Sequence, residues 1–118
     1  MRVHLAVISE HFSERVTDGG SPVDLADTAV PASAEGPAAE RLVDAIARAV
    51  RAMRIRLRST PAGGDAPLRL GVISTTEAGT GLEVDTAALS LQDVDFASKA
   101  GRADVLDALH ELERAFLR

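Results

Sequence analysis

The sequence contains no cysteine, no tryptophan and no tyrosine, and it has only three phenylalanines in 118 residues. The absence of cysteine excludes disulfide bonds, thiolate metal sites and cysteine nucleophiles. The scarcity of aromatic residues leaves few side chains that could stack on nucleic-acid bases or anchor an interface. The core must therefore consist of aliphatic side chains.

Long hydrophobic runs are also missing. No stretch approaches the roughly 20 apolar residues that span a bilayer, and the apolar run near the N-terminus is too short for a secretory signal. Hydrophobic residues make up 46% of the chain and charged residues 26%, which is ordinary for a globular protein. Because this length suits one core rather than two, we expect residues 1–118 to form a single cytoplasmic domain without membrane contact.

Positive charge is scarce and unevenly placed. The net charge is −5, lysine occurs only at Lys99, and six of the thirteen basic residues lie in one short segment. A nucleic-acid partner is not expected, because nucleic-acid binders usually carry a basic patch within a basic domain. A protein partner fits the arginines better. The predicted partner-binding residues are Arg41, Arg48, Arg51, Arg54 and Arg58.

Two apolar runs predict the central strands. Residues 3–9 and 68–75 are continuous and rich in β-branched residues, which is typical of strands buried on both faces. Residues 82–86 alternate and predict a strand that forms a hairpin with 68–75. We expect a long polar loop region over residues 10–36 and a turn over residues 61–67.

Helical periodicity follows from Pro37, a residue favoured in a first helical turn. The apolar positions recur on one helix face, at Leu42, Ile46, Ala49, Val50, Met53 and Leu57. Residues 54–58 instead alternate with a period of two, so this segment is either a fraying helix or a charged edge strand. A short helical turn after residues 90–93 would end at Gly101, and a second long helix is predicted over residues 103–117.

Self-similarity suggests an internal repeat. Residues 5–9 match 70–74, residues 23–24 match 84–85, and residues 42–46 match 105–109, in the same order. The matches indicate either a duplicated strand–loop–helix unit or the general similarity of aliphatic strands and helices. Each half would supply the apolar cover that the other lacks. We therefore predict an α/β or α+β two-layer sandwich in the order β-α-β-β-α, with a ferredoxin-like fold as the alternative.

The ends of the two apolar strands form the candidate ligand site. If these strands are parallel neighbours, their polar ends meet at one sheet edge, where ligands bind in α/β proteins. The candidate ligand-binding residues are Ser9, Glu10, His11, Ser74, Thr75 and Glu77. His11 could act as a general base, with Glu10 and Glu77 as further catalytic candidates. The alternative interpretation is a polar loop with a solvated histidine.

No cofactor motif is present. Three scattered histidines without cysteine do not make a zinc site, and no glycine-rich phosphate motif occurs. We expect neither a metal nor a cofactor. The sequence favours a small non-enzymatic interaction or assembly module, self-associating or accessory to a larger protein, because the two predicted helices carry opposite charge. The alternative is a small-molecule-binding protein or enzyme that uses the strand ends.

Overall fold

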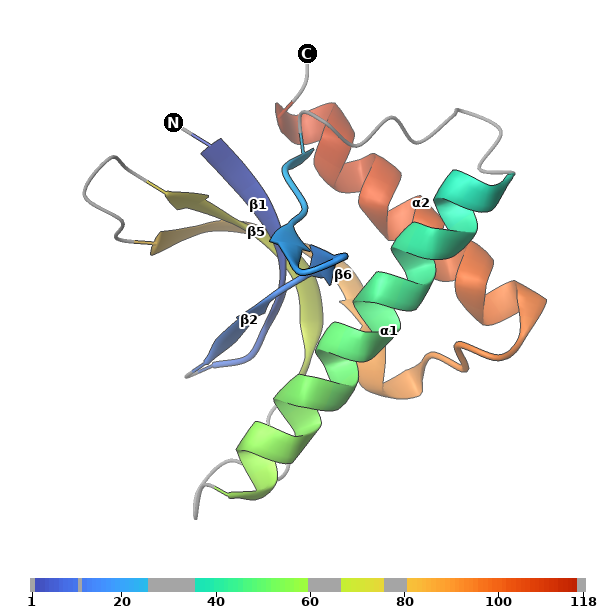
Figure 1. The fold of residues 1–118 in the computed structure, drawn as a ribbon, viewed down its shortest axis with the longest axis horizontal. Coiled ribbons are helices and arrows are strands. Elements are labelled where there is room, and N and C mark those ends of the chain that lie inside the picture. The colour runs from blue at the N-terminus through green and yellow to red at the C-terminus, as the bar shows by residue number, and fades with distance from the viewer. Residues whose placement is uncertain (1, 11, 26–35, 60–66, 76–80, 117–118) are drawn as a thin grey trace.

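The computed structural model describes residues 2–10, 12–25, 36–59, 67–75 and 81–116. The elements in chain order are β1 (Arg2–Ile8), β2 (Ser13–Arg15), β3 (Thr17–Asp18), β4 (Ser21–Pro22), α1 (Pro37–Arg58), β5 (Arg69–Thr75), β6 (Gly81–Ser90), the 3₁₀ turn η2 (Leu91–Asp93) and α2 (Lys99–Phe116). The main sheet has the order β2-β1-β5-β6. Figure 1 shows this curled sheet beside the two long helices. The chain is therefore an α+β fold.

The two faces of the sheet have different surroundings. Leu5 and Val7 of β1 and Leu70 and Val72 of β5 share one hydrophobic core with the buried faces of α1 and α2. Since side chains alternate along a strand, the intervening residues lie on the other face. We call that face the open face. It carries a separate small cluster made of Ala6, Ile8 and Ile73.

The predicted pairing of the two apolar strands is half right. Strands β1 and β5 are neighbours, as expected, but they run antiparallel, with Leu5 opposite Val72 and Val7 opposite Leu70. The parallel arrangement is wrong because the chain reverses in β2 before it enters α1. Strand β2 pairs antiparallel with β1, so the helical crossover connects β2 with β5 and passes over β1. The expected β-α-β-β-α order omits this strand, and the pairing gives the ferredoxin-like alternative no support.

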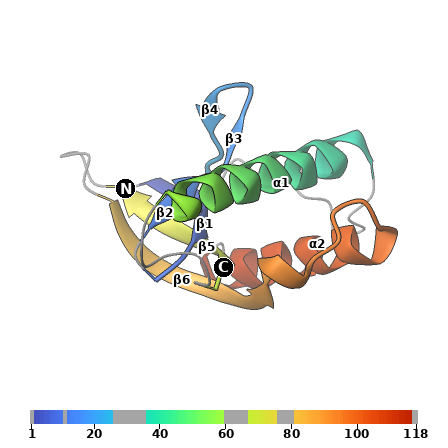
Figure 2. The ribbon, with the colours of Figure 1, turned by 90° about the horizontal axis from the view of Figure 1, so that it is seen from below.

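Part of the polar region 10–36 is ordered into short strands. After β2, the chain forms the β3–β4 ribbon, which projects from the body of the molecule (Figure 2). It then returns to β1, where the backbone N–H of Leu5 donates to the carbonyl of Val23 and His4 forms a bridge with Asp24. Residues 26–35 lie outside the described residues, as does most of the turn predicted over 61–67.

The helix α1 continues to Arg58, so residues 54–58 are helical rather than an edge strand. An arginine occupies position 56 of this helix because its side chain contacts β2. Arg56 forms an ion pair with Glu14 at 2.7 Å and donates to the carbonyl of Ser13 at 3.3 Å, so this arginine lies along β2. Ile55 remains 60% exposed.

The start of α2 differs from the prediction. Gly101 does not end a helix but lies in the first turn of α2, which begins at Lys99. The hydroxyl of Ser98 accepts the backbone N–H of Gly101 at 3.0 Å, the geometry of an N-cap. Glycine is needed at position 101 because a Cβ there would overlap the carbonyl oxygen of Asp95.

Arg102 joins the two helices. Its guanidinium forms ion pairs with Glu40 and, at 3.0 Å, with Asp44, both on α1. It also donates to the carbonyl of Phe96 at 3.1 Å. Burial alone lowers the pKa of Arg102, but the hydrogen bonds to Asp44 and Glu40 outweigh it and the pKa is raised. The N-terminal halves of α1 and α2 are thereby held together.

Glu113 occupies a half-buried position on α2. Its Oε1 and the Nε2 of His110 are buried and have no hydrogen-bond partner among the described residues. Burial raises the pKa of Glu113, and the nearby charge of His110 opposes this shift only in part. The ionised form of Glu113 is thus disfavoured in the folded protein.

We expect Gly101→Ala to destabilise the fold. Overpacking costs about 1–3 kcal/mol, whereas alanine gains only about 1 kcal/mol over glycine within a helix. Urea denaturation would measure the free energy of unfolding. The control is Gly81→Ala, because the nearest atom to a Cβ at 81 is 3.8 Å away. A Gly101→Ala protein as stable as the wild type would contradict the close contact with Asp95.

We expect Glu113→Gln to make stability less dependent on pH. Because the folded-state pKa of Glu113 is raised, the folded protein binds more protons than the unfolded chain between the two pKa values. The free energy of unfolding therefore falls as pH rises through that window, and the variant lacks this fall. Unfolding at a series of pH values would show the variant's advantage growing from acidic to neutral pH. A gap independent of pH, or the same gap in the exposed control Glu111→Gln, would disprove this assignment.

Candidate functional site

The strand-end residues predicted to form one site are separated by the antiparallel register. Ser9 and Glu10 follow the end of β1, where Ile8 lies opposite Arg69. Ser74 and Thr75 lie at the other end of the pairing, where Thr75 is opposite Arg2. The predicted convergence of the two strand ends is therefore wrong. His11 and Glu77 lie outside the described residues.

The two serines are also buried. The hydroxyl of Ser9 accepts the backbone N–H of Phe12 and donates to its carbonyl, both at 3.1 Å, so it holds the turn between β1 and β2. The hydroxyl of Ser74 is buried and has no hydrogen-bond partner among the described residues. Ser74 follows Val72 by two residues and so lies on the helix-covered face of the sheet.

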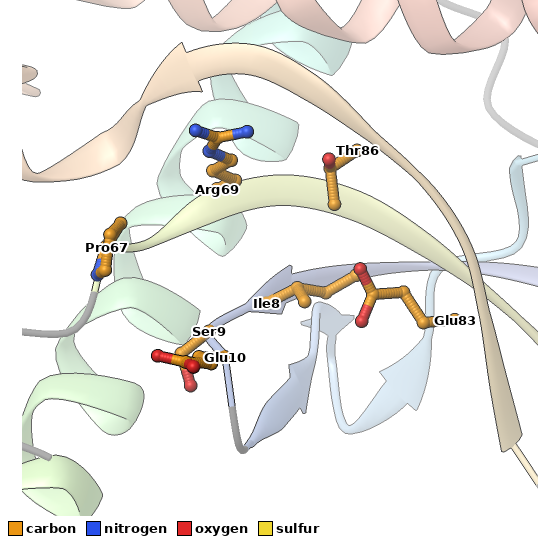
Figure 3. Close-up of a pocket in the computed structure, with 7 residues that line it drawn as sticks. All are labelled: Ile8, Ser9, Glu10, Pro67, Arg69, Glu83 and Thr86. Atoms are coloured by element: carbon orange, nitrogen blue, oxygen red, sulfur yellow. The ribbon is translucent and has the colours of Figure 1, made fainter. Parts of the chain in front are cut away.

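A hollow on the open face brings Glu10 together with residues from β5 and β6. Its volume is about 430 Å³, and it is lined by Ile8, Ser9, Glu10, Pro67, Arg69, Glu83 and Thr86 (Figure 3). The sequence prediction missed Arg69, Glu83 and Thr86. The one available signal was the charged Arg69 at an outward position within an otherwise apolar run. We call this site the open-face hollow.

Two features of the sheet form this hollow. The register between β5 and β6 shifts between Arg69 and Gly71 and again between Val72 and Ile73. Such irregularities bend a strand and increase its twist. At Gly71, an added Cβ would lie 2.5 Å from Cδ1 of Ile8 and 2.8 Å from the carbonyl oxygen of Asp85. Ile8 therefore lies across Gly71 and forms the floor of the hollow.

The arginines of α1 divide into two groups. Arg41 forms an ion pair with Asp18 at 3.0 Å and so links α1 to the β3–β4 ribbon, whereas Arg56 links α1 to β2 at the edge of the main sheet. Arg48 is exposed on the same helix. Of the predicted partner-binding residues, Arg41 therefore has a partner within the fold.

The other predicted arginines, Arg51, Arg54 and Arg58, line a groove beside α1. The groove has a volume of about 260 Å³ and is completed by Ala47, Val50, Ile55 and Phe96. The structure gives the three arginines no ion pair with any described residue. The α1 groove thus combines free guanidinium groups with the exposed side chain of Ile55.

The exposed face of α2 is acidic. Asp104, Asp107 and Glu111 are all exposed and follow one another at intervals of three and four residues. Arg51, Arg54 and Arg58 have the same spacing on α1. Figure 1 shows that α1 and α2 cross one another rather than lying parallel, although Figure 2 shows both running toward the sheet. The helix layer therefore presents a basic row and an acidic row of matching spacing.

Within the described ranges, no group of three or more histidine or acidic side chains could hold a metal ion. None of the helices in that part of the chain combines the length and apolar character needed to cross a bilayer. Comparison with known proteins gives no match to any family model, any curated protein or any solved structure.

Proposed function

We propose that the protein is a small assembly module that self-associates, with the α1 groove of one copy binding the acidic face of α2 on a second copy. The observation that carries this proposal is the matching spacing of the two charged rows. Arg51, Arg54 and Arg58 span about two helical turns, and so do Asp104, Asp107 and Glu111. Opposite charges in equal spacing favour one register of two helices over others.

The two charged rows suit a symmetric dimer. Because the basic row lies on α1 and the acidic row lies on α2 of the same chain, a two-fold axis between two copies would place each α1 against the partner's α2. Both pairings would then form at once, as in an isologous interface. A dimer of this kind closes on itself and needs no third copy.

The apolar part of the groove would supply affinity, and the charges would supply specificity. Exposed ion pairs contribute only about 0–1 kcal/mol each and are weakened by salt. Burying apolar surface yields about 25 cal/mol per Å², and Ile55 is 60% exposed in the single chain. We therefore propose a weak, salt-sensitive association centred on Ile55 and Phe96, which line the groove.

The proposal describes a non-enzymatic, cytoplasmic protein. The separation of the predicted strand ends supports the non-enzymatic part of the proposal, since Ser9 and Ser74 lie at opposite ends of the β1–β5 pair. An accessory role is the second candidate, because an acidic helix of a larger protein would suit the same groove. We also propose that the chain arose by duplication of a strand–loop–helix unit. In its favour, residues 42–46 and 105–109 have the same order of buried and exposed positions.

The two charged rows give a direct test. The double variants Arg51→Glu/Arg54→Glu and Asp107→Arg/Glu111→Arg should each be monomeric, because like charges would then face one another. Mixed in equal amounts, they should form a dimer again, since their reversed rows are complementary. Light scattering coupled to size exclusion, at low salt and over a range of concentrations, measures the mass.

The matched control is Arg2→Glu/Arg15→Glu, which makes the same change in net charge as Arg51→Glu/Arg54→Glu at exposed residues of the sheet, outside the groove. This variant should dimerise like the wild type. A wild-type protein that stays monomeric at all concentrations overturns self-association. Equal weakening by the control pair, or a mixture that remains monomeric, would show that the two rows do not meet.

A further inference from the structure

We propose that the open-face hollow binds a small zwitterion whose carboxylate meets Arg69 and whose ammonium group meets Glu83, with a short aliphatic part over Ile8. The site lies on the opposite face of the sheet from α1 and α2. It does not depend on the proposed self-association.

The curl of the sheet makes the open-face hollow a shallow concave surface that stays open to solvent. Ile8 and Ile73 are only 4% and 6% exposed, although they belong to a cluster separate from the core that the helices cover. The two register shifts of β6 curl the sheet around them. A volume of about 430 Å³ suits a small molecule rather than a polypeptide segment. Bulges of this kind are often found next to functional sites.

Opposite charges line the hollow without neutralising each other. Arg69 lies directly opposite Ile8 in the β1–β5 register, and no described residue forms an ion pair with it. Glu83 lies opposite Ile73 on β6, and its side chain extends toward Ile8 in Figure 3. The two side chains share one hollow but form no ion pair with each other. A ligand with both charges would satisfy both at once.

The neighbouring groups favour a carboxylate at the Arg69 end. A planar guanidinium can bind a carboxylate through two parallel hydrogen bonds. Thr86, on the adjacent strand, lines the same hollow and offers a hydroxyl that can donate to the same group. Pro67 is exposed and adds apolar surface beside these groups, and the nearly buried Ile8 lies beneath them. This combination of a few polar groups on an apolar floor is typical of small-molecule sites.

Ligands of a single charge fit less well. A phosphate or another purely anionic ligand would meet the carboxylates of Glu10 and Glu83, which line the hollow with Arg69. A simple amine would leave Arg69 unpaired, and an apolar ligand would remove all these charges from water without compensation. A zwitterion leaves both Arg69 and Glu83 paired.

L-Leucine, leucinamide and N-acetylleucine provide matched probes, because they share an aliphatic side chain and differ in charge. Leucine carries both charges, leucinamide only the positive one and N-acetylleucine only the negative one. Binding would be followed by NMR, through shifts of the Ile8 methyl signals during titration. We expect leucine to bind in the millimolar range and each analogue to bind about tenfold more weakly, since one charge-assisted contact is lost.

Two variants assign each charge to its residue. In Arg69→Met, the carboxylate of the probe should no longer matter, so leucine and leucinamide should bind equally. In Glu83→Gln, the ammonium group should no longer matter, so leucine and N-acetylleucine should bind equally. The control Arg2→Met removes an exposed arginine at the far end of β1 and should leave all three affinities unchanged.

Several outcomes would overturn the proposal. These are no binding of leucine, equal binding of the three probes by the wild type, or unchanged preferences in both variants. The mass of Arg69→Met in solution separates this site from the assembly function. We expect it to match the wild type, so that loss of leucine binding without a change in mass identifies the hollow alone.

Discussion

The antiparallel pairing of β1 with β5 is the interaction on which the rest of the molecule depends. These two strands form the centre of the sheet, and their register directs Leu5, Val7, Leu70 and Val72 into the common core. A slip of one residue would turn a whole strand over, because side chains alternate between the faces. The same register places Arg69 beside Ile8 on the open face. The register of β1 with β5 therefore determines both the buried core and the open-face hollow.

The register also relates the two halves of the chain. The segments 5–9 and 70–74 cross at Ala6 and Gly71, which lie opposite each other. Leu5 pairs with Val72, and their sequence counterparts Leu70 and Val7 pair as well. Any antiparallel pair centred on Ala6 and Gly71 exchanges its neighbours in this way, so the register is compatible with the proposed duplication. The match of residues 23–24 with 84–85 fits less well, since Asp24 is opposite His4 whereas Asp85 is opposite Val72.

The sequence predicted those elements whose burial imposes a periodic pattern of apolar residues. The apolar runs identified β1 and β5, and the helical spacing identified the buried face of α1, because each pattern reflects a surface that must leave water. Strand β2 could not be predicted, since its three polar residues owe their conformation to the edge of β1 rather than to propensity. Missing this one strand was enough to reverse the expected direction of β5.

The candidate sites, like the fold, could be predicted only where a periodic pattern marks them. The row of arginines on α1 can be read from spacing alone, but the ion pair that binds Arg41 to Asp18 depends on the β3–β4 ribbon and cannot. The open-face hollow was beyond prediction for a related reason. Arg69, Glu83 and Thr86 come together through two register shifts in β6, and the sequence carries no periodic signal for a bulge.

The β3–β4 ribbon has a consequence for how this chain could change. Its two ends are joined at the base, where the backbone N–H of Val23 donates to the carbonyl of Val16 at 3.0 Å. Chain inserted or removed between these residues would leave the junction, and hence the sheet, in place, because loop closure costs little more for a longer loop. Evolution or an engineer could therefore exchange the ribbon for another peptide and display it from the same sheet, with the loss of the ion pair between Asp18 and Arg41.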